Sequence, residues 1–102
     1  MSENNNSPVL EKKSSVKPKA PRKYAVILLN DNSTTFEFVI EVLMIIFNKS
    51  FEDAKNITLE IHEKQKGIAG VFMKEIAVSK SKEVQELAEN KKYPLKSIVE
   101  AV

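Results

Sequence analysis

Apolar side chains are sparse in the first 22 residues and then return in blocks that polar turns separate. The block KYAVILLN, residues 23–30, is rich in branched apolar residues and ends in turn formers, which predicts a buried strand. Between Thr34 and Asn48 nearly every position is apolar, which is typical of a helix in the middle of a domain. Thr34 and Glu37 have the spacing of a capping box, so we expect this helix to begin at Thr34.

A second helix is predicted over residues 50–67. Ser50 and Asp53 have the spacing of another capping box, and we expect the helix to stop at Gly67. The side chains expected to face inward follow a helical period: Phe51, Ala54, Ile57 and Ile61.

Three more elements are predicted over residues 68–102, a strand, a helix and a closing strand. The segment IAGVFMKEIA, residues 68–77, predicts a strand, and residues 78–91 have the mixed apolar and charged period of an amphipathic helix. Tyr93-Pro94 ends this helix, because proline disfavours helical geometry in the residue before it. Residues 95–102, LKSIVEAV, predict a closing strand. The order β-α-α-β-α-β predicts a two-layer α+β fold, a three-stranded antiparallel sheet with three helices on one face.

Composition and charge separate the leading segment from this domain. Residues 1–22 hold three of the four prolines and little that could be buried, so we expect a flexible N-terminal extension there. The folded domain is expected over residues 23–102. The extension carries five basic residues against two acids, a net charge of +3, whereas the domain carries 11 lysines against 12 acids, a net charge of −1. A nearly neutral domain lacks the clustered basic face of a nucleic-acid binder.

Several classes of protein are disfavoured by what the sequence lacks. It has no cysteine, hence no disulfide, thiol nucleophile or thiolate metal site. No apolar run approaches the length of a bilayer span, and MSENNNSPVL lacks the layout of a secretion signal, so we expect a cytoplasmic protein. The chain has no glycine-rich phosphate loop and no nucleophile elbow. We therefore expect a binding module that is not an enzyme and uses no cofactor.

The first candidate for chemistry is NDNSTT, residues 30–35, between the first strand and the first helix. These residue types tolerate tight turns and cap helices, so a turn alone would account for them. Alternatively, Asn30 and Asp31 place two oxygen acceptors at the mouth of an apolar core. Acceptors in that position suit a cation with several N–H donors, such as an ammonium group.

The second candidate is His62, the only histidine in the chain. It lies at the edge of the apolar stripe of the second predicted helix, beside Ile61, and one interpretation is a boundary residue without a ligand. Without a second histidine or an acid at zinc-binding spacing, no metal site is expected. A neutral imidazole could instead accept a third hydrogen bond from an ammonium group.

Three segments in register, YAVILLNDNSTTFEFVIEVL, ITLEIHEKQKGIAGVFMKEIA and YPL, closely resemble ClpS, the bacterial N-degron adaptor. The resemblance runs from about Lys23 to Val102. It implies a monomeric adaptor that grips a protein's exposed first residue and delivers the chain to a ClpA- or ClpC-type AAA+ unfoldase, without nucleic acid or membrane. It further implies that the extension engages the unfoldase pore, and that Glu75 and Lys80 dock on the N-terminal domain of the chaperone.

The resemblance also implies a binding site. Asn30, Asp31 and His62 are implied to hold the free α-amino group, with Asn32 at the pocket mouth. The bulky first side chain, Leu, Phe, Tyr or Trp, is implied to enter an apolar pocket. The matching wall and rim positions are Thr34, Phe36, Val39, Thr58, Ile61 and Leu95.

Four residues depart from the common family pattern, in which a second aspartate, two methionines and a glycine occupy these places: Asn32, Phe36, Thr58 and Gln65. They leave open the preference among Leu, Phe, Tyr and Trp and the bend after the second helix. The order of elements also resembles the C-terminal domain of the ribosomal stalk protein. The alternative function is therefore a pocketless ribosome-associated or structural interaction domain, although that family lacks the Asn-Asp turn and the helix histidine.

Overall fold

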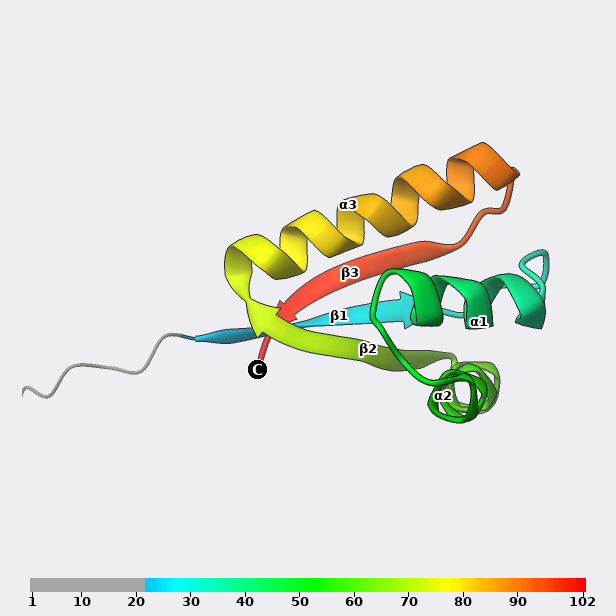
Figure 1. Ribbon diagram of the computed structural model, residues 1–102, viewed down its shortest axis with the longest axis horizontal. Helices are drawn as coiled ribbons and strands as arrows, with labels where there is room; N and C mark the ends of the chain where they lie inside the picture. The colour runs from blue at the N-terminus through cyan, green and yellow to red at the C-terminus, as the bar shows by residue number, and fades with distance from the viewer. Residues whose placement is uncertain (1–21) are drawn as a thin grey trace, which may run out of the picture.

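The computed structural model describes residues 22–102, whose arrangement is shown in Figure 1. The flexible extension expected over residues 1–22 lies, apart from Arg22, outside the described residues. In chain order the elements are β1 (Lys23–Leu29), α1 (Phe36–Ile45), α2 (Phe51–Lys64), β2 (Lys66–Met73), α3 (Lys74–Lys91) and β3 (Lys96–Ala101). The predicted order β-α-α-β-α-β is confirmed.

The strands form one antiparallel sheet in the order β2-β1-β3, as expected. Because side chains alternate along a strand, Val26 and Leu28 of the central strand β1 belong to the main hydrophobic core, whereas Ala25 and Ile27 point to the other face. A bulge between Val26 and Ile27 shifts the register between β1 and β2. The middle of β1 is therefore buried on both faces.

The helices cover the face of the sheet that carries Val26 and Leu28 (Figure 1). Phe38 of α1 stacks on Tyr93, with ring centroids 4.6 Å apart, and ties α1 to the segment before β3. The buried apolar residues of the helices share one core: Phe38, Val39, Val42, Leu43, Ala54, Ile61, Ala77, Val84 and Ala88. This arrangement is the two-layer α+β fold that the sequence predicts.

The first helix begins later than its predicted capping box. The hydroxyl of Thr34 donates a hydrogen bond to Asp31 Oδ2 at 2.7 Å, so Thr34 does not cap the helix. Thr35 is the N-cap instead, because its Oγ1 accepts a hydrogen bond from the backbone N–H of Phe38 at 3.1 Å. The capping box of Thr34 and Glu37 is therefore wrong.

The second helix begins as predicted, because Ser50 Oγ accepts a hydrogen bond from the backbone N–H of Asp53 at 3.1 Å. It ends before the predicted stop at Gly67, since Gln65 takes a left-handed conformation with φ of 75°. Gly67 belongs to β2 instead. A Cβ at this position would lie 2.8 Å from Ile61 Cγ1, so glycine lets β2 pack closely against α2.

Two further expectations are wrong. Phe51 was expected to face inward, but it lies in the first turn of α2 and about half of its side chain is exposed. The predicted strand over residues 68–77 ends at Met73, and α3 starts at Lys74 rather than at residue 78. The sequence KEIA after Met73 contains strong helix formers, so these residues join α3. The end of α3 before Pro94 agrees with the prediction.

Candidate functional site

The turn between β1 and α1 is organised by the carboxylate of Asp31. Its Oδ1 accepts hydrogen bonds from the backbone N–H groups of Ser33 and Thr34, both at 2.8 Å, and its Oδ2 accepts one from Thr34 Oγ1. The interpretation of NDNSTT as a turn is therefore confirmed for Asp31. A carboxylate has about four acceptor positions, so three donors leave capacity for a ligand donor.

Asn30 is held by Gln65, the residue that ends α2. The backbone N–H of Asn30 donates to the Gln65 carbonyl at 2.9 Å, and Asn30 Nδ2 donates to Gln65 Oε1 at 3.4 Å. Gln65 Nε2 in turn donates to the carbonyl oxygen of His62 at 3.1 Å. Because the amide nitrogen of Asn30 points toward Gln65, its Oδ1 lies on the opposite side of the amide group as an acceptor.

An apolar cavity lies directly behind this turn. Its free space is about 10 Å³, room for at most one water molecule. The buried hydroxyl of Thr58 is satisfied, because it donates to the Ala54 carbonyl at 2.8 Å. Among the described residues that line the cavity, Asp31 is the only ionisable side chain. The lining residues are Leu29, Asn30, Asp31, Thr34, Phe36, Val39, Thr58, Ile61 and Leu95.

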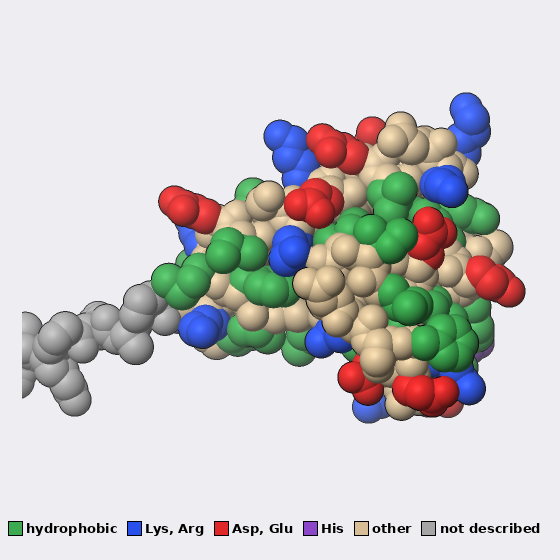
Figure 2. Space-filling model, viewed as in Figure 1, with side chains coloured by type: hydrophobic (Ala, Val, Ile, Leu, Met, Phe, Trp, Pro, Cys, Tyr) green, Lys and Arg blue, Asp and Glu red, His purple; other side chains and the backbone are tan. Residues whose placement is uncertain are grey.

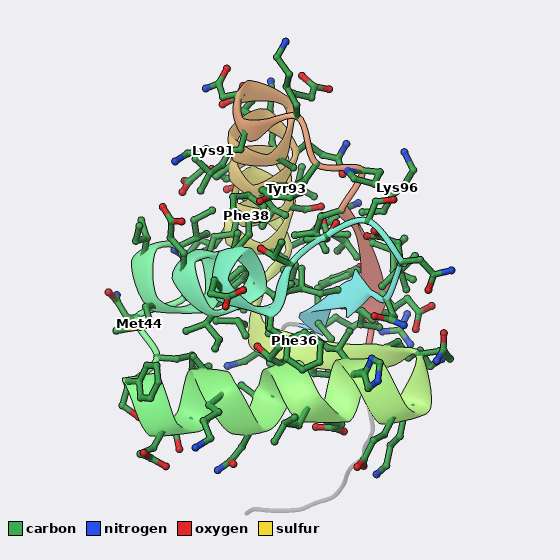
Figure 3. The ribbon with its side chains drawn as sticks, turned by 90° about the vertical axis from the view of Figure 1, so that its right-hand side faces the viewer. Phe36, Phe38, Met44, Lys91, Tyr93 and Lys96 are labelled. Carbon is green, nitrogen blue, oxygen red and sulfur yellow. The ribbon has the colours of Figure 1, made fainter. Side chains whose placement is uncertain are left out.

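Phe36 connects the cavity to His62. The two rings meet edge to face, with centroids 5.2 Å apart and planes at 69°. Phe36 is 42% exposed, so it is the outer wall of a cavity whose other apolar walls are mostly buried. Figure 3, which looks onto this end of the domain, shows Phe36 between α1 and α2. A movement of this one ring would change both the cavity and the surroundings of the imidazole.

The structure brings most of the predicted site residues together. All the predicted pocket residues line the cavity, as do Asn30 and Asp31, while His62 adjoins it through Phe36. Asn32 is exposed and is not among the lining residues. Leu29 was not predicted, although an apolar residue directly before Asn30 was a signal for it. The binding roles of these residues stay predictions.

Glu75 and Lys80 lie apart from the cavity, on α3. Glu75 is exposed in the first turn of that helix. The half-buried Lys80 donates from Nζ to the Ile46 carbonyl at 2.9 Å and lies 6.0 and 5.6 Å from the ring centroids of Phe47 and Phe72. A cation at the C-terminal end of a helix is favourable, so Lys80 stabilises the end of α1. Its role in chaperone docking stays a prediction.

Other features of the described chain are separate from this site. Within residues 22–102, no three His, Asp or Glu side chains are grouped so that they could hold a metal ion. None of the helices in this part of the chain combines the length and apolar character needed to cross a membrane. Larger hollows of about 360 Å³ and 440 Å³ lie beside Ile27, on the face of the sheet opposite the main core, and along α1.

Comparison with known proteins defines the class of protein. The model of the family described as ATP-dependent Clp protease adaptor protein ClpS matches residues 19–98. The ATP-dependent Clp protease adapter protein ClpS of Campylobacter jejuni is 49% identical over 80 residues, which are 78% of this chain and 83% of that protein. The protein of the same name from Acetivibrio thermocellus is 41% identical over 92 residues, 90% of this chain and 93% of the relative.

A solved structure agrees with these relatives. It is that of Agrobacterium tumefaciens ClpS2 bound to L-phenylalaninamide, which matches with a TM-score of 0.79 and 31% identity over 81% of this chain and 100% of that one. Fold and relatives together define an adaptor protein of a protease rather than a protease. The chain belongs to the ClpS family, the adaptors of the ATP-dependent Clp protease. The resemblance seen in the sequence is therefore confirmed.

Proposed function

We propose that this adaptor binds proteins by a free α-amino group and a bulky first residue, Leu, Phe, Tyr or Trp, and delivers them to a ClpA- or ClpC-type unfoldase for ATP-dependent degradation. One observation carries the proposal: Asn30 and Asp31 lie at the mouth of an apolar cavity, with His62 beside its outer wall. The amide oxygen, the carboxylate and the imidazole are three acceptors, which match the three N–H donors of an ammonium group.

Recognition has a polar part and an apolar part. An ammonium group that leaves water needs charge-assisted hydrogen bonds, because its desolvation would otherwise cancel the gain. Burial of a Leu or Phe side chain contributes about 1.5–3 kcal/mol. An internal Leu has no ammonium group, and an acetylated terminus leaves the acceptors underused at a cost of about 1–3 kcal/mol per group. The two parts together therefore select a free terminus with a large apolar residue.

The size of the cavity gives Phe36 a specific role in this proposal. A free space of about 10 Å³ cannot take a Leu side chain, so a wall has to move when the first residue binds. Phe36 is the exposed wall, and its contact with His62 is worth only about 0.5–1.5 kcal/mol. Rotation of this ring away from His62 would enlarge the cavity and free the imidazole for the amine. Phe36 is thus the movable wall of the pocket.

The ligand of the structural relative supports the class of ligand. L-phenylalaninamide has a free α-amino group, a benzyl side chain and an amide in place of a carboxylate, so it has the chemistry of a protein's first residue. The fold match covers the whole of the relative that binds it. By analogy we assign the first residue of a substrate, rather than an internal segment, to the cavity of this chain.

For delivery, we assign Glu75 and Lys80 on α3 to the contact with the N-terminal domain of the chaperone. Both residues lie away from the cavity, so docking leaves the peptide entrance open. The protein is proposed to act as a monomer, without nucleic acid or a membrane.

A pair of labelled peptides tests the proposal by fluorescence anisotropy, one beginning with Leu and its twin acetylated at the amino end. We expect the free peptide to bind and the acetylated one to fail. Asn30→Ala and His62→Ala should each weaken binding strongly while the domain stays folded, as its thermal unfolding transition would show. Equal binding of both peptides would refute recognition of the amine. If neither peptide bound, the pocketless interaction domain would be the better description.

A further inference from the structure

A second, exposed apolar surface lies along α1, the helix that also carries the cavity residues Phe36 and Val39. It is a groove of about 440 Å³ along α1 and the first turn of α2, which we name the α1–α2 groove. Its lining residues are Glu37, Ile40, Glu41, Met44, Ile45 and Phe51. Ile45, Phe51 and Met44 are 63%, 51% and 39% exposed. Neither the core nor the cavity accounts for these side chains, and a contiguous apolar patch of this kind is typical of an interaction site.

The groove continues the candidate site along α1. Phe36 is the outer wall of the cavity, and Glu37, the next residue, is the first wall of the groove. Figure 3 shows Phe36 and Met44 toward opposite ends of α1. A helix rises about 1.5 Å per residue, which places Met44 about 12 Å from Phe36 along α1. An extended peptide advances about 3.3 Å per residue, so a chain whose first residue is in the cavity reaches Met44 with about its fourth or fifth residue.

The groove is negatively charged, which favours an occupant that carries a positive charge. Glu37 and Glu41 lie one turn apart on α1, a spacing at which like charges repel each other. Within the described part of the chain, no basic side chain lines the groove. Figure 2 shows hydrophobic side chains over α1 and the start of α2, with acidic side chains on either side of them. A ligand cation would relieve this repulsion.

We propose that the α1–α2 groove binds the fourth and fifth residues of substrates and favours an apolar side chain next to Lys or Arg. The inference rests on the proposed function and extends it from the first residue to the following segment. The substrate's apolar side chain would cover Met44 and Ile45, and its cation would pair with Glu37 and Glu41. A second copy of this chain is a poorer occupant, because two facing grooves would bring their acidic residues together.

Two peptides with the same labelled tail test the inference by fluorescence anisotropy, one beginning Leu-Gly-Gly-Leu-Lys and the other Leu-Gly-Gly-Ser-Gly. We expect the first to bind the unmodified protein about fivefold more tightly or better, because one Leu is partly buried and one cation is paired. The double variant Met44→Gln/Ile45→Gln should remove the part of this difference that comes from the Leu side chain, so the remaining advantage should be less than half as large, and it should leave the binding of the second peptide unchanged. Glutamine is a good helix former, so α1 should keep its stability.

The matched control is Ile76→Gln/Val78→Gln on α3, where both residues are 49% exposed and lie outside the groove. This control should keep the full difference between the two peptides. Glu41→Gln should reduce the advantage of Lys at the fifth residue, and more so at low salt, where charges are less screened. Loss of the difference in the control variant as well would contradict a specific groove.

The outcomes separate this inference from the proposed function. If both peptides bind the unmodified protein equally, and their acetylated forms do not bind, the groove inference is wrong and the proposed function stands. If binding does not depend on a free amino group, the proposed function fails and the groove inference fails with it. If Met44→Gln/Ile45→Gln instead dissociates a dimer in sedimentation experiments, a second copy occupies the groove and the inference is overturned.

Discussion

Replacement of Gln65 by glycine should weaken peptide binding and leave the free energy of unfolding nearly unchanged. Gln65 has a left-handed backbone, with φ of 75° and ψ of −7°, a conformation that costs a residue with a side chain about 1–2 kcal/mol. Glycine removes this cost but loses about 0.5–1 kcal/mol through its freedom in the unfolded chain. It also loses the bond to the His62 carbonyl, worth about 0.5–1.5 kcal/mol. These contributions nearly cancel, so the free energy of unfolding should change by less than about 1 kcal/mol.

Peptide binding should respond differently, because the same substitution removes the side chain that orients Asn30. Gln65 Oε1 lies 3.4 Å from Asn30 Nδ2, whereas the backbone bond between the two residues, at 2.9 Å, is kept. Without the contact, the Asn30 side chain has to be ordered when the amine binds, at a cost of about 0.5–1.5 kcal/mol. This cost corresponds to binding that is about 2- to 13-fold weaker.

Titration of a labelled peptide beginning with Leu, together with urea unfolding of the same variant, measures both effects. The matched control is Gln65→Ala, which loses the amide but keeps the left-handed strain, so it should lose stability as well as affinity. If Gln65→Gly binds the peptide with the affinity of the unmodified protein, Gln65 does not position Asn30 and the reasoning is refuted.

Three further substitutions test the packing around the site. Thr35→Ala removes the N-cap of α1 and should lower the free energy of unfolding by about 1 kcal/mol in urea titrations; an unchanged value would contradict the cap. Gly67→Ala brings a Cβ within 2.8 Å of Ile61, a cavity wall, and should cost about 1–3 kcal/mol and weaken peptide binding; unaltered binding would argue against this coupling. Asp31→Ala removes three hydrogen bonds and should lower the thermal midpoint, whereas a silent change would show that the turn does not need its carboxylate.

The order of elements could be predicted from the sequence, because turn formers separate its hydrophobic blocks. The boundaries of the elements could not be predicted, because they depend on which of several possible hydrogen bonds forms in the folded protein. Thr34 and Thr35 are both possible caps, and only the folded turn shows that Asp31 takes the hydroxyl of Thr34. At the junction of β2 and α3, the strand-like sequence is followed directly by strong helix formers. The spacing of the apolar residues alone therefore does not show that the helix begins at Lys74.

The candidate site, too, could be predicted only in part from the sequence. Reasoning from the residues identifies the Asn-Asp turn and the histidine, and the resemblance supplies the pocket wall. Gln65, whose side chain contacts Asn30, lies 35 positions further along the chain, so no local sequence pattern indicates this contact. The exposed stripe of α1 is missed for another reason. An apolar composition shows that Met44 and Ile45 are hydrophobic, but not whether anything in the fold covers them.

The backbone N–H of Val102 donates to the carbonyl of Lys23 at 2.9 Å, so the domain starts and finishes at the same end of the sheet. From there β1 runs about 20 Å to Asn30 at about 3.3 Å per residue (Figure 1). A force applied to the chain at Arg22 would therefore act at the end of β1 opposite Asn30 and the cavity. A dye or affinity handle attached at Val102 would therefore lie at the end of the sheet away from the cavity.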